Sequence, residues 1–139
     1  MQFTTLLTTL TLALITTANP TRPSPNTMVL NDLNNGVKCA NRDGGSVNAL
    51  ITNFCRHNHN GDTLNGVTVG TEWARGGLRY NGMKVSITGA NCPANSKWVP
   101  SEYCEGQFTW MCATGGPKGG NVARFGVNGC QTWKIEKHA

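Results

Sequence analysis

The sequence predicts an α+β fold in which two helices pack on one face of a four-stranded antiparallel sheet, held by three disulfides. Two segments carry the apolar period of amphipathic helices, and others alternate with the two-residue period of strands. Six cysteines fall in the same part of the chain. The expected order of elements is β-α-β-β-α-β, the split βαβ arrangement.

Residues 1–18 are predicted to be a secretory signal peptide. This stretch is apolar and rich in threonine, and it is shorter than the roughly 20 apolar residues that a bilayer span needs. No basic residue precedes it, which departs from the usual pattern, and a buried or membrane-spanning helix is the alternative. Residues 19–36 are polar and spaced by prolines, so a flexible leader or propeptide remnant is expected there. Residues 37–139 then form a single disulfide-bonded domain.

The first strand is expected at Val37–Ala40, where apolar and polar residues alternate before the turn-forming cluster Asn41–Gly45. Ser46 follows in the N-cap position of the first helix. The apolar residues of that helix recur at the spacing of one helical face, at Val47, Leu50, Ile51, Phe54 and Cys55.

The middle of the chain, from Thr63 to Thr88, has the alternation of strands. Asn81-Gly82 predicts a hairpin, because a type I′ turn needs positive φ at both central residues. Gly76-Gly77 predicts a bulge or a broken strand just before it. A second turn at Thr63–Gly66 would divide the region into three strands rather than two.

A second helix is predicted between the start signal Pro100-Ser101 and the stop signal Gly115-Gly116-Pro117. Its buried stripe is expected to hold Cys104, Phe108, Met111 and Cys112. The β-branched and aromatic residues of the segment 130–135 predict a closing strand.

An even number of cysteines in a small secreted domain predicts three disulfides. Each bridge typically contributes about 2 to 4 kcal/mol of stability. No Cys-x-x-Cys spacing occurs, so neither a metal site nor a cofactor is expected. The sequence does not choose among the pairings of Cys39, Cys55, Cys92, Cys104, Cys112 and Cys130.

This order of elements, with its cysteines, resembles the fungal small secreted cysteine-rich proteins. Within these it is similar to the killer-toxin-like group, whose members share a two-helix, four-strand sandwich with the secreted killer toxins of smut-fungus viruses. The resemblance covers residues 37–135 and transfers no residue roles. It implies an extracellular effector or toxin that acts on a host or a competitor.

The formal net charge of +5 favours anionic partners such as cell-wall polysaccharide, phospholipid or nucleic acid. A basic and aromatic face around the hairpin and one aromatic residue off the buried stripe of the second helix are the candidate binding residues: Trp73, Arg75, Arg79, Tyr80, Lys84 and Trp110. A host protein or a cell-wall glycan is the expected partner of a monomeric, extracellular protein. Neither nucleic acid binding nor a membrane span is expected.

Two chemical alternatives involve the only histidine cluster. His57 and His59, together with Asp62, offer an exposed metal site or a general acid and base. A secreted ribonuclease would need a histidine, a glutamate and an arginine on one sheet face, for which His57 or His59, Glu72, and Arg75 or Arg79 are available. The order of elements departs from that enzyme family. We therefore expect an effector that binds without turnover, with a killer-toxin-like antimicrobial protein or a ribonuclease as the alternatives.

Overall fold

The computed structural model describes residues 25–43, 45–58 and 65–138. The helices of this part are α1 (Pro25–Asp43), α2 (Ser46–Cys55), α3 (Glu72–Gly76) and α4 (Ser101–Thr114), with 3-10 turns η1 (Ala94–Ser96), η2 (Pro117–Gly119) and η3 (Val127–Gly129). The strands are β1 (Gly66–Thr68), β2 (Leu78–Tyr80), β3 (Met83–Thr88), β4 (Trp98–Pro100), β5 (Asn121–Phe125) and β6 (Gln131–Lys137). The predicted signal peptide, 1–18, lies outside the described residues.

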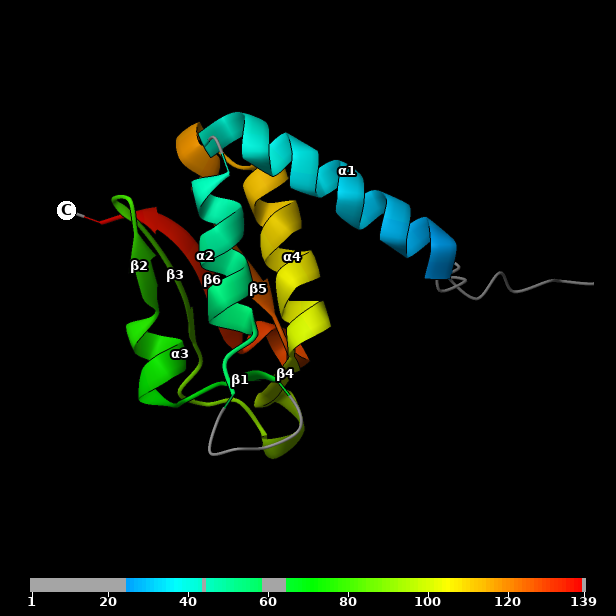
Figure 1. Cartoon of the computed structure of the whole chain (residues 1–139). Coiled ribbons are helices and arrows are strands. Elements are labelled where there is room, and N and C mark those ends of the chain that lie inside the picture. The colour runs from blue at the N-terminus through cyan, green and yellow to red at the C-terminus, as the bar shows by residue number, and fades with distance from the viewer. Residues whose placement is uncertain (1–24, 44, 59–64, 139) are drawn as a thin grey trace, which may run out of the picture.

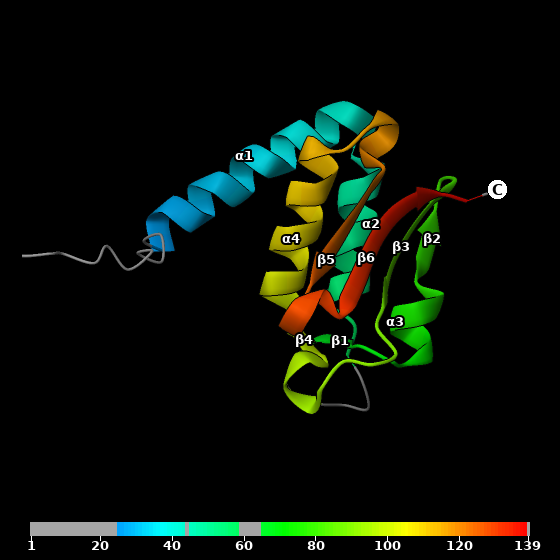
Figure 2. The ribbon, with the colours of Figure 1, turned by 180° about the vertical axis from the view of Figure 1, so that it is seen from behind.

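The strands form two antiparallel sheets. The larger has the order β2-β3-β6-β5, and the smaller pairs β1 with β4. In Figure 1, α2 and α4 stand in front of β5 and β6, and in Figure 2, from behind, the two strands stand in front of the helices. Both helices therefore lie on the same side of these strands. The predicted α+β class with antiparallel strands and three disulfides is confirmed.

The core lies between these helices and the larger sheet, and aromatic rings fill its centre. Phe108 of α4 packs edge-on to Phe54 of α2, with ring centroids 5.7 Å apart, and tilts against Trp133 of β6 at 4.7 Å. Neither Phe54, Phe108 nor Trp133 is exposed to solvent. Aromatic pairs at such distances stabilise a core beyond the area they bury.

Both amphipathic patterns are confirmed as helices. The stripe predicted for the first is the set of residues that α2 buries, and the stripe predicted for the second is buried in α4 together with Ala113. Gly45, in the left-handed region with φ 91°, takes the N-cap position predicted for Ser46. The stop signal is confirmed as well, since Gly115 caps the C-terminus of α4.

The predicted first strand at Val37–Ala40 is wrong, because these residues belong to α1. Four alternating residues do not distinguish a strand from one side of a helix. The helical conformation places Cys39 and Arg42, three residues apart, on the side that faces α4. Helix α1 also includes residues 25–36, part of the segment for which the composition predicts a flexible leader.

The hairpin is confirmed, with positive φ at both Asn81 and Gly82 (48° and 75°) and Tyr80 paired with Met83. The Gly76-Gly77 pair differs from the predicted bulge. Gly76 ends the short helix α3, and Gly77, with φ 68°, leads into β2. Thr71 caps α3 by accepting a hydrogen bond from the amide of Ala74. Two of the four residues of the second turn predicted at 63–66, residues 63 and 64, lie outside the described residues, and Gly66 begins β1. Strand β5 was not predicted.

Two of the disulfides link helices to each other, and the third links a loop to the start of a strand. Cys39–Cys112 links α1 to α4, Cys55–Cys104 links α2 to α4, and Cys92–Cys130 links the segment after β3 to the residue before β6. Within the described residues, no helix is long and apolar enough to cross a membrane.

Candidate functional site

The outer side of the larger sheet is the candidate binding surface. Trp133 and Ile135 of β6 are buried on the helical side, so the alternate side chains Thr132, Lys134 and Glu136 point the opposite way. Their neighbours on β2, β3 and β5 follow from the antiparallel register. We call this surface the open face.

The open face consists of three rows of side chains across the strands. Its nine residues, row by row, are Arg79, Lys84 and Glu136, then Ser86, Lys134 and Val122, then Thr88, Thr132 and Arg124. Ser86 is covered, at 2% exposure, whereas Arg79, Val122 and Arg124 are exposed. The other five residues are half-buried, so eight of the nine side chains are at least partly accessible.

The charge of the open face is predominantly positive. Arg79, Lys84, Lys134 and Arg124 contribute four cations, against the single carboxylate of Glu136. Within the described part of the chain, none of the four forms an ion pair. A group of unpaired like charges raises the local concentration of ions of opposite sign.

A cavity of about 450 Å³ lies at the Arg124 end of the open face. It is lined by all three residues of the third row, by the segment after β3 and by the turn before β6. Arg124 is the sole charged residue among those that line it: Thr88, Gly89, Ala90, Asn91, Arg124, Asn128, Gly129, Cys130 and Thr132. Thr88, Thr132, Asn91 and Asn128 contribute hydroxyl and amide side chains to the lining. The cavity therefore combines one cation with neutral hydrogen-bonding groups.

A glycine in the turn before β6 leaves room for the side chain of Arg124. Gly129 has φ 66°, a left-handed conformation that glycine adopts without strain. A Cβ at Gly129 would lie 3.6 Å from Cβ and 3.8 Å from Cδ of Arg124, so the arginine side chain runs along this glycine. The Cys92–Cys130 disulfide joins the two segments that line the cavity.

Only two of the predicted binding residues meet on the open face. Arg79 of β2 and Lys84 of β3 lie directly opposite each other in the register. Tyr80 is next to Arg79 and so points to the other side of β2, although it is 54% exposed. Arg75 lies on α3 and pairs with Glu72, with 3.2 Å between Nη2 and Oε1.

The two predicted tryptophans lie elsewhere. Trp73 is half-buried on α3: its Nε1 donates a hydrogen bond to the carbonyl oxygen of Phe54, and its ring stacks on His57 with centroids 3.9 Å apart. Trp110 is exposed on α4, as its position off the buried stripe predicts. The structure therefore separates the predicted set into several surfaces.

The predicted acid/base and metal residues do not form one described cluster. His57 stacks on Trp73, and Glu72, predicted to lie on the sheet, is on α3. His59 and Asp62 lie outside the described residues. Among residues 25–43, 45–58 and 65–138, no group of three or more histidine, cysteine, aspartate or glutamate side chains has the geometry to hold a metal.

Sequence reasoning missed Arg124, Lys134, Thr88 and Thr132. The alternation within the closing strand was a usable signal, because buried Trp133 and Ile135 place Lys134 on the opposite side. Arg124 gave no such signal, because its strand was not predicted. Its place beside Thr132 depends on the pairing of β5 with β6.

A second and larger hollow, of about 1010 Å³, lies among α1, α2 and α4. Arg56 and Glu105 form an ion pair in its wall, with 2.6 Å between Nε and Oε1. A hydrogen bond from Arg56 to Glu105, and then the attraction of the carboxylate, raise the pKa of the arginine above its ordinary value. Arg56 is thus neutralised by Glu105, and the other charged residues that line this hollow, Asp32 and Glu102, are acidic, so it offers no unpaired cation comparable with Arg124.

Comparison of the chain with protein-family models, with curated protein sequences and with solved structures finds no significant match to any of them.

Proposed function

We propose that the chain is a secreted, disulfide-stabilised effector that acts by binding an acidic polysaccharide on its open face. The observation that carries this proposal is the group of four cations without ion-pair partners among the described residues. The three disulfides support secretion, because such bonds form and persist in oxidising, extracellular surroundings. A cell-wall glycan also satisfies the partner class expected from the sequence.

The spacing of the cations suits a polymer with a negative charge on each unit. Neighbouring strands lie about 4.8 Å apart, and alternate residues of one strand lie about 6.7 Å apart. Arg79 and Lys84 lie at one end of the open face, Lys134 in the middle row and Arg124 at the other end. A chain laid diagonally over the sheet, from β2 in the first row to β5 in the third, therefore meets a cation in each row.

The chemistry of the open face favours a polysaccharide over a nucleic acid. Proteins that bind single-stranded nucleic acids stack bases on aromatic side chains, and none of the nine residues that define this surface is aromatic. Thr88 and Thr132 instead provide hydroxyl groups beside Arg124, which suit the hydroxyls of sugar rings. We therefore propose a uronic-acid polymer as the class of ligand.

The test compares the binding of polygalacturonate with that of the same polymer after complete methyl esterification, which removes the charge and keeps the backbone. We expect binding to polygalacturonate only, with an affinity that falls as salt rises. The double variant Lys84→Ala/Lys134→Ala should weaken binding at least about tenfold, since it removes two charged contacts.

The matched control is Lys38→Ala/Lys97→Ala, which removes the same charge from exposed lysines off the open face. This variant should bind nearly as well as the unmodified protein. Equal losses in the two double variants would refute the assignment of the open face. Equal affinity for duplex DNA and for polygalacturonate would refute the assignment to a polysaccharide.

A killer-toxin-like antimicrobial protein is the second candidate. The resemblance of the sequence implies a two-helix, four-strand sandwich, and the four-stranded sheet with α2 and α4 beside it (Figure 1) supports this candidate. Growth of competing microbes in the presence of the oxidised protein tests this candidate. Inhibition by the unmodified protein but not by Lys84→Ala/Lys134→Ala would assign the toxin activity to the open face.

A further inference from the structure

We infer that the cavity beside Arg124 is a subsite for the carboxylate of a single uronic-acid residue, an inference that rests on the proposed function. The remainder of the open face would attract the polymer, and this cavity would select a sugar unit within it. Its volume of about 450 Å³ falls within the range of small-molecule sites. In this open hollow, Arg124 of the open face adjoins uncharged polar side chains.

Arg124 has the chemistry that a carboxylate subsite needs. Its planar guanidinium presents paired N–H donors that match the two oxygens of a carboxylate. Among the described residues, its side chain has neither a hydrogen bond nor an ion pair, so a ligand would not have to displace an internal partner. No acidic side chain lines the cavity to repel an anion.

The other polar residues of the cavity suit a sugar rather than a bare anion. Thr88 and Thr132 face each other across β3 and β6, and Asn91 and Asn128 lie in the flanking segments. Hydroxyl and amide side chains both donate and accept hydrogen bonds, as sugar hydroxyls do. The Thr88 hydroxyl already donates to the carbonyl oxygen of Thr132 at 3.5 Å, which leaves its oxygen free to accept. A simple anion would use Arg124 and leave the other groups to water.

The cavity is also built on constrained backbone. Cys92–Cys130 ties the segment after β3 to the turn before β6. A Cβ at Gly89 would lie 2.8 Å from Cγ1 of Val69 and 3.1 Å from the carbonyl oxygen of Cys130, so the chain is closely packed behind the cavity. A site held in place before binding loses less entropy when its ligand enters.

The experiment measures the binding of trigalacturonate and of a neutral galactose trimer by calorimetry, with phosphate as a third probe. We expect Arg124→Ala to weaken trigalacturonate binding about tenfold and Arg124→Lys to recover only part of it, because an ammonium lacks the two-pronged geometry. The weak affinity for the galactose trimer should be the same in all three proteins. Lys38→Ala is the control, because it removes one positive charge from an exposed position off the open face, and it should bind the trimer normally.

Amide shifts in NMR spectra locate the ligand independently of any variant. Trigalacturonate should shift the amides of Gly129 and Thr132 and leave that of Arg79 unchanged. Equal trimer affinity in Arg124→Ala and the unmodified protein, while polygalacturonate still binds, would overturn the subsite and leave the proposed function intact. Phosphate that displaces the trimer at equal concentration would overturn the assignment to a uronic acid. Failure of polygalacturonate itself to bind would overturn both.

Discussion

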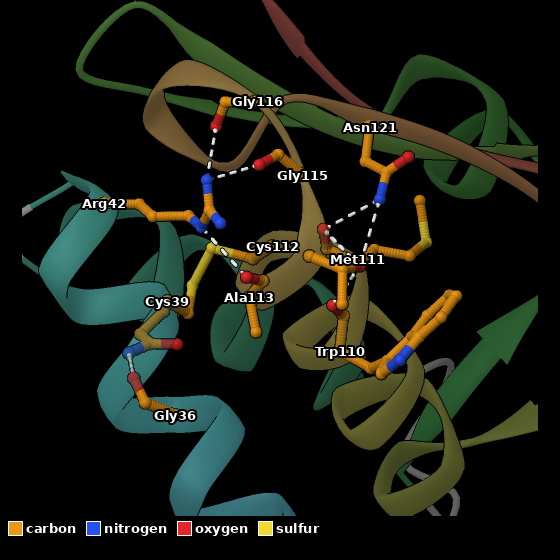
Figure 3. Close-up of a disulfide and its surroundings, with 12 residues drawn as sticks. Gly36, Cys39, Arg42, Trp110, Met111, Cys112, Ala113, Gly115, Gly116 and Asn121 are labelled. Carbon is orange, nitrogen blue, oxygen red and sulfur yellow. Dashed lines mark hydrogen bonds between the residues drawn. A yellow bond between two sulfur atoms is a disulfide. The ribbon is translucent and has the colours of Figure 1, made fainter.

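Arg42 donates a hydrogen bond of 2.9 Å from Nε to the carbonyl oxygen of Ala113, the residue that follows Cys112. Its Nη1 also donates to the carbonyl oxygens of Gly115 and Gly116 (Figure 3). The last carbonyls of a helix lack partners within it, and a cation there is favourable. The side chain of α1 therefore caps the C-terminus of α4 beside the disulfide that joins the two helices.

Arg42→Ala should lower the free energy of unfolding by about 1 kcal/mol, because it leaves these carbonyls to water. Lys38→Ala is the matched control, an exposed cation of the same helix. It should change stability by less than about 0.5 kcal/mol. Urea denaturation of the oxidised proteins measures both, and equal values would contradict the capping role.

Gly77→Ala should destabilise the protein by about 3 kcal/mol or more. A Cβ at Gly77 would lie 2.1 Å from the carbonyl oxygen of Val85, and φ is 68° there. Gly76→Ala is the neighbouring control, because no atom lies within 4 Å of its Cβ position and its φ is not in the left-handed region. We expect Gly76→Ala to be neutral or slightly stabilising in thermal unfolding. Similar losses at the two positions would contradict this contrast.

Cys92–Cys130 should be the first disulfide that a mild reductant opens. Cys92 is 6% exposed and Cys130 is half-buried, whereas the other four cysteines are fully buried. Thiol–disulfide exchange requires access to the sulfur atom, so the more exposed disulfide should be reduced faster. Stepwise reduction, alkylation and peptide mass mapping should label Cys92 and Cys130 before any other pair. Earlier labelling of Cys55 and Cys104 would contradict this order.

The sequence predicts correctly those segments whose structure is determined by a local pattern of residues. The apolar residues from Val47 to Cys55 and from Cys104 to Cys112 recur with the period of a helix, and both segments are helices that bury those residues. Asn81-Gly82 predicts a hairpin turn because these two residue types adopt the positive φ angles that the turn requires. In these segments local preference and tertiary packing agree.

The rest of the fold depends on distant contacts. Helix α1 is polar and rich in asparagine, a poor helix former, and Cys39 and Arg42 attach it to α4. Strand β5 lies in a glycine-rich stretch at the edge of the sheet, where its pairing with β6 determines its conformation. For the same reason Arg124 was missed: its neighbours Thr132 and Gly129 are known only once that pairing is formed. Arg79 and Lys84 were found because a hairpin makes their pairing local.

The three disulfides overlap along the chain, and this has a consequence for proteolysis. Cys39–Cys112 spans every peptide bond from residue 39 to 112, and Cys92–Cys130 continues that span to residue 130. A single cut anywhere between Cys39 and Cys130 therefore leaves both fragments covalently joined. Such a nicked molecule would retain its mass without reductant and separate into two pieces with it. A protein that meets host or microbial proteases outside the cell would in this way survive a single cleavage as one molecule.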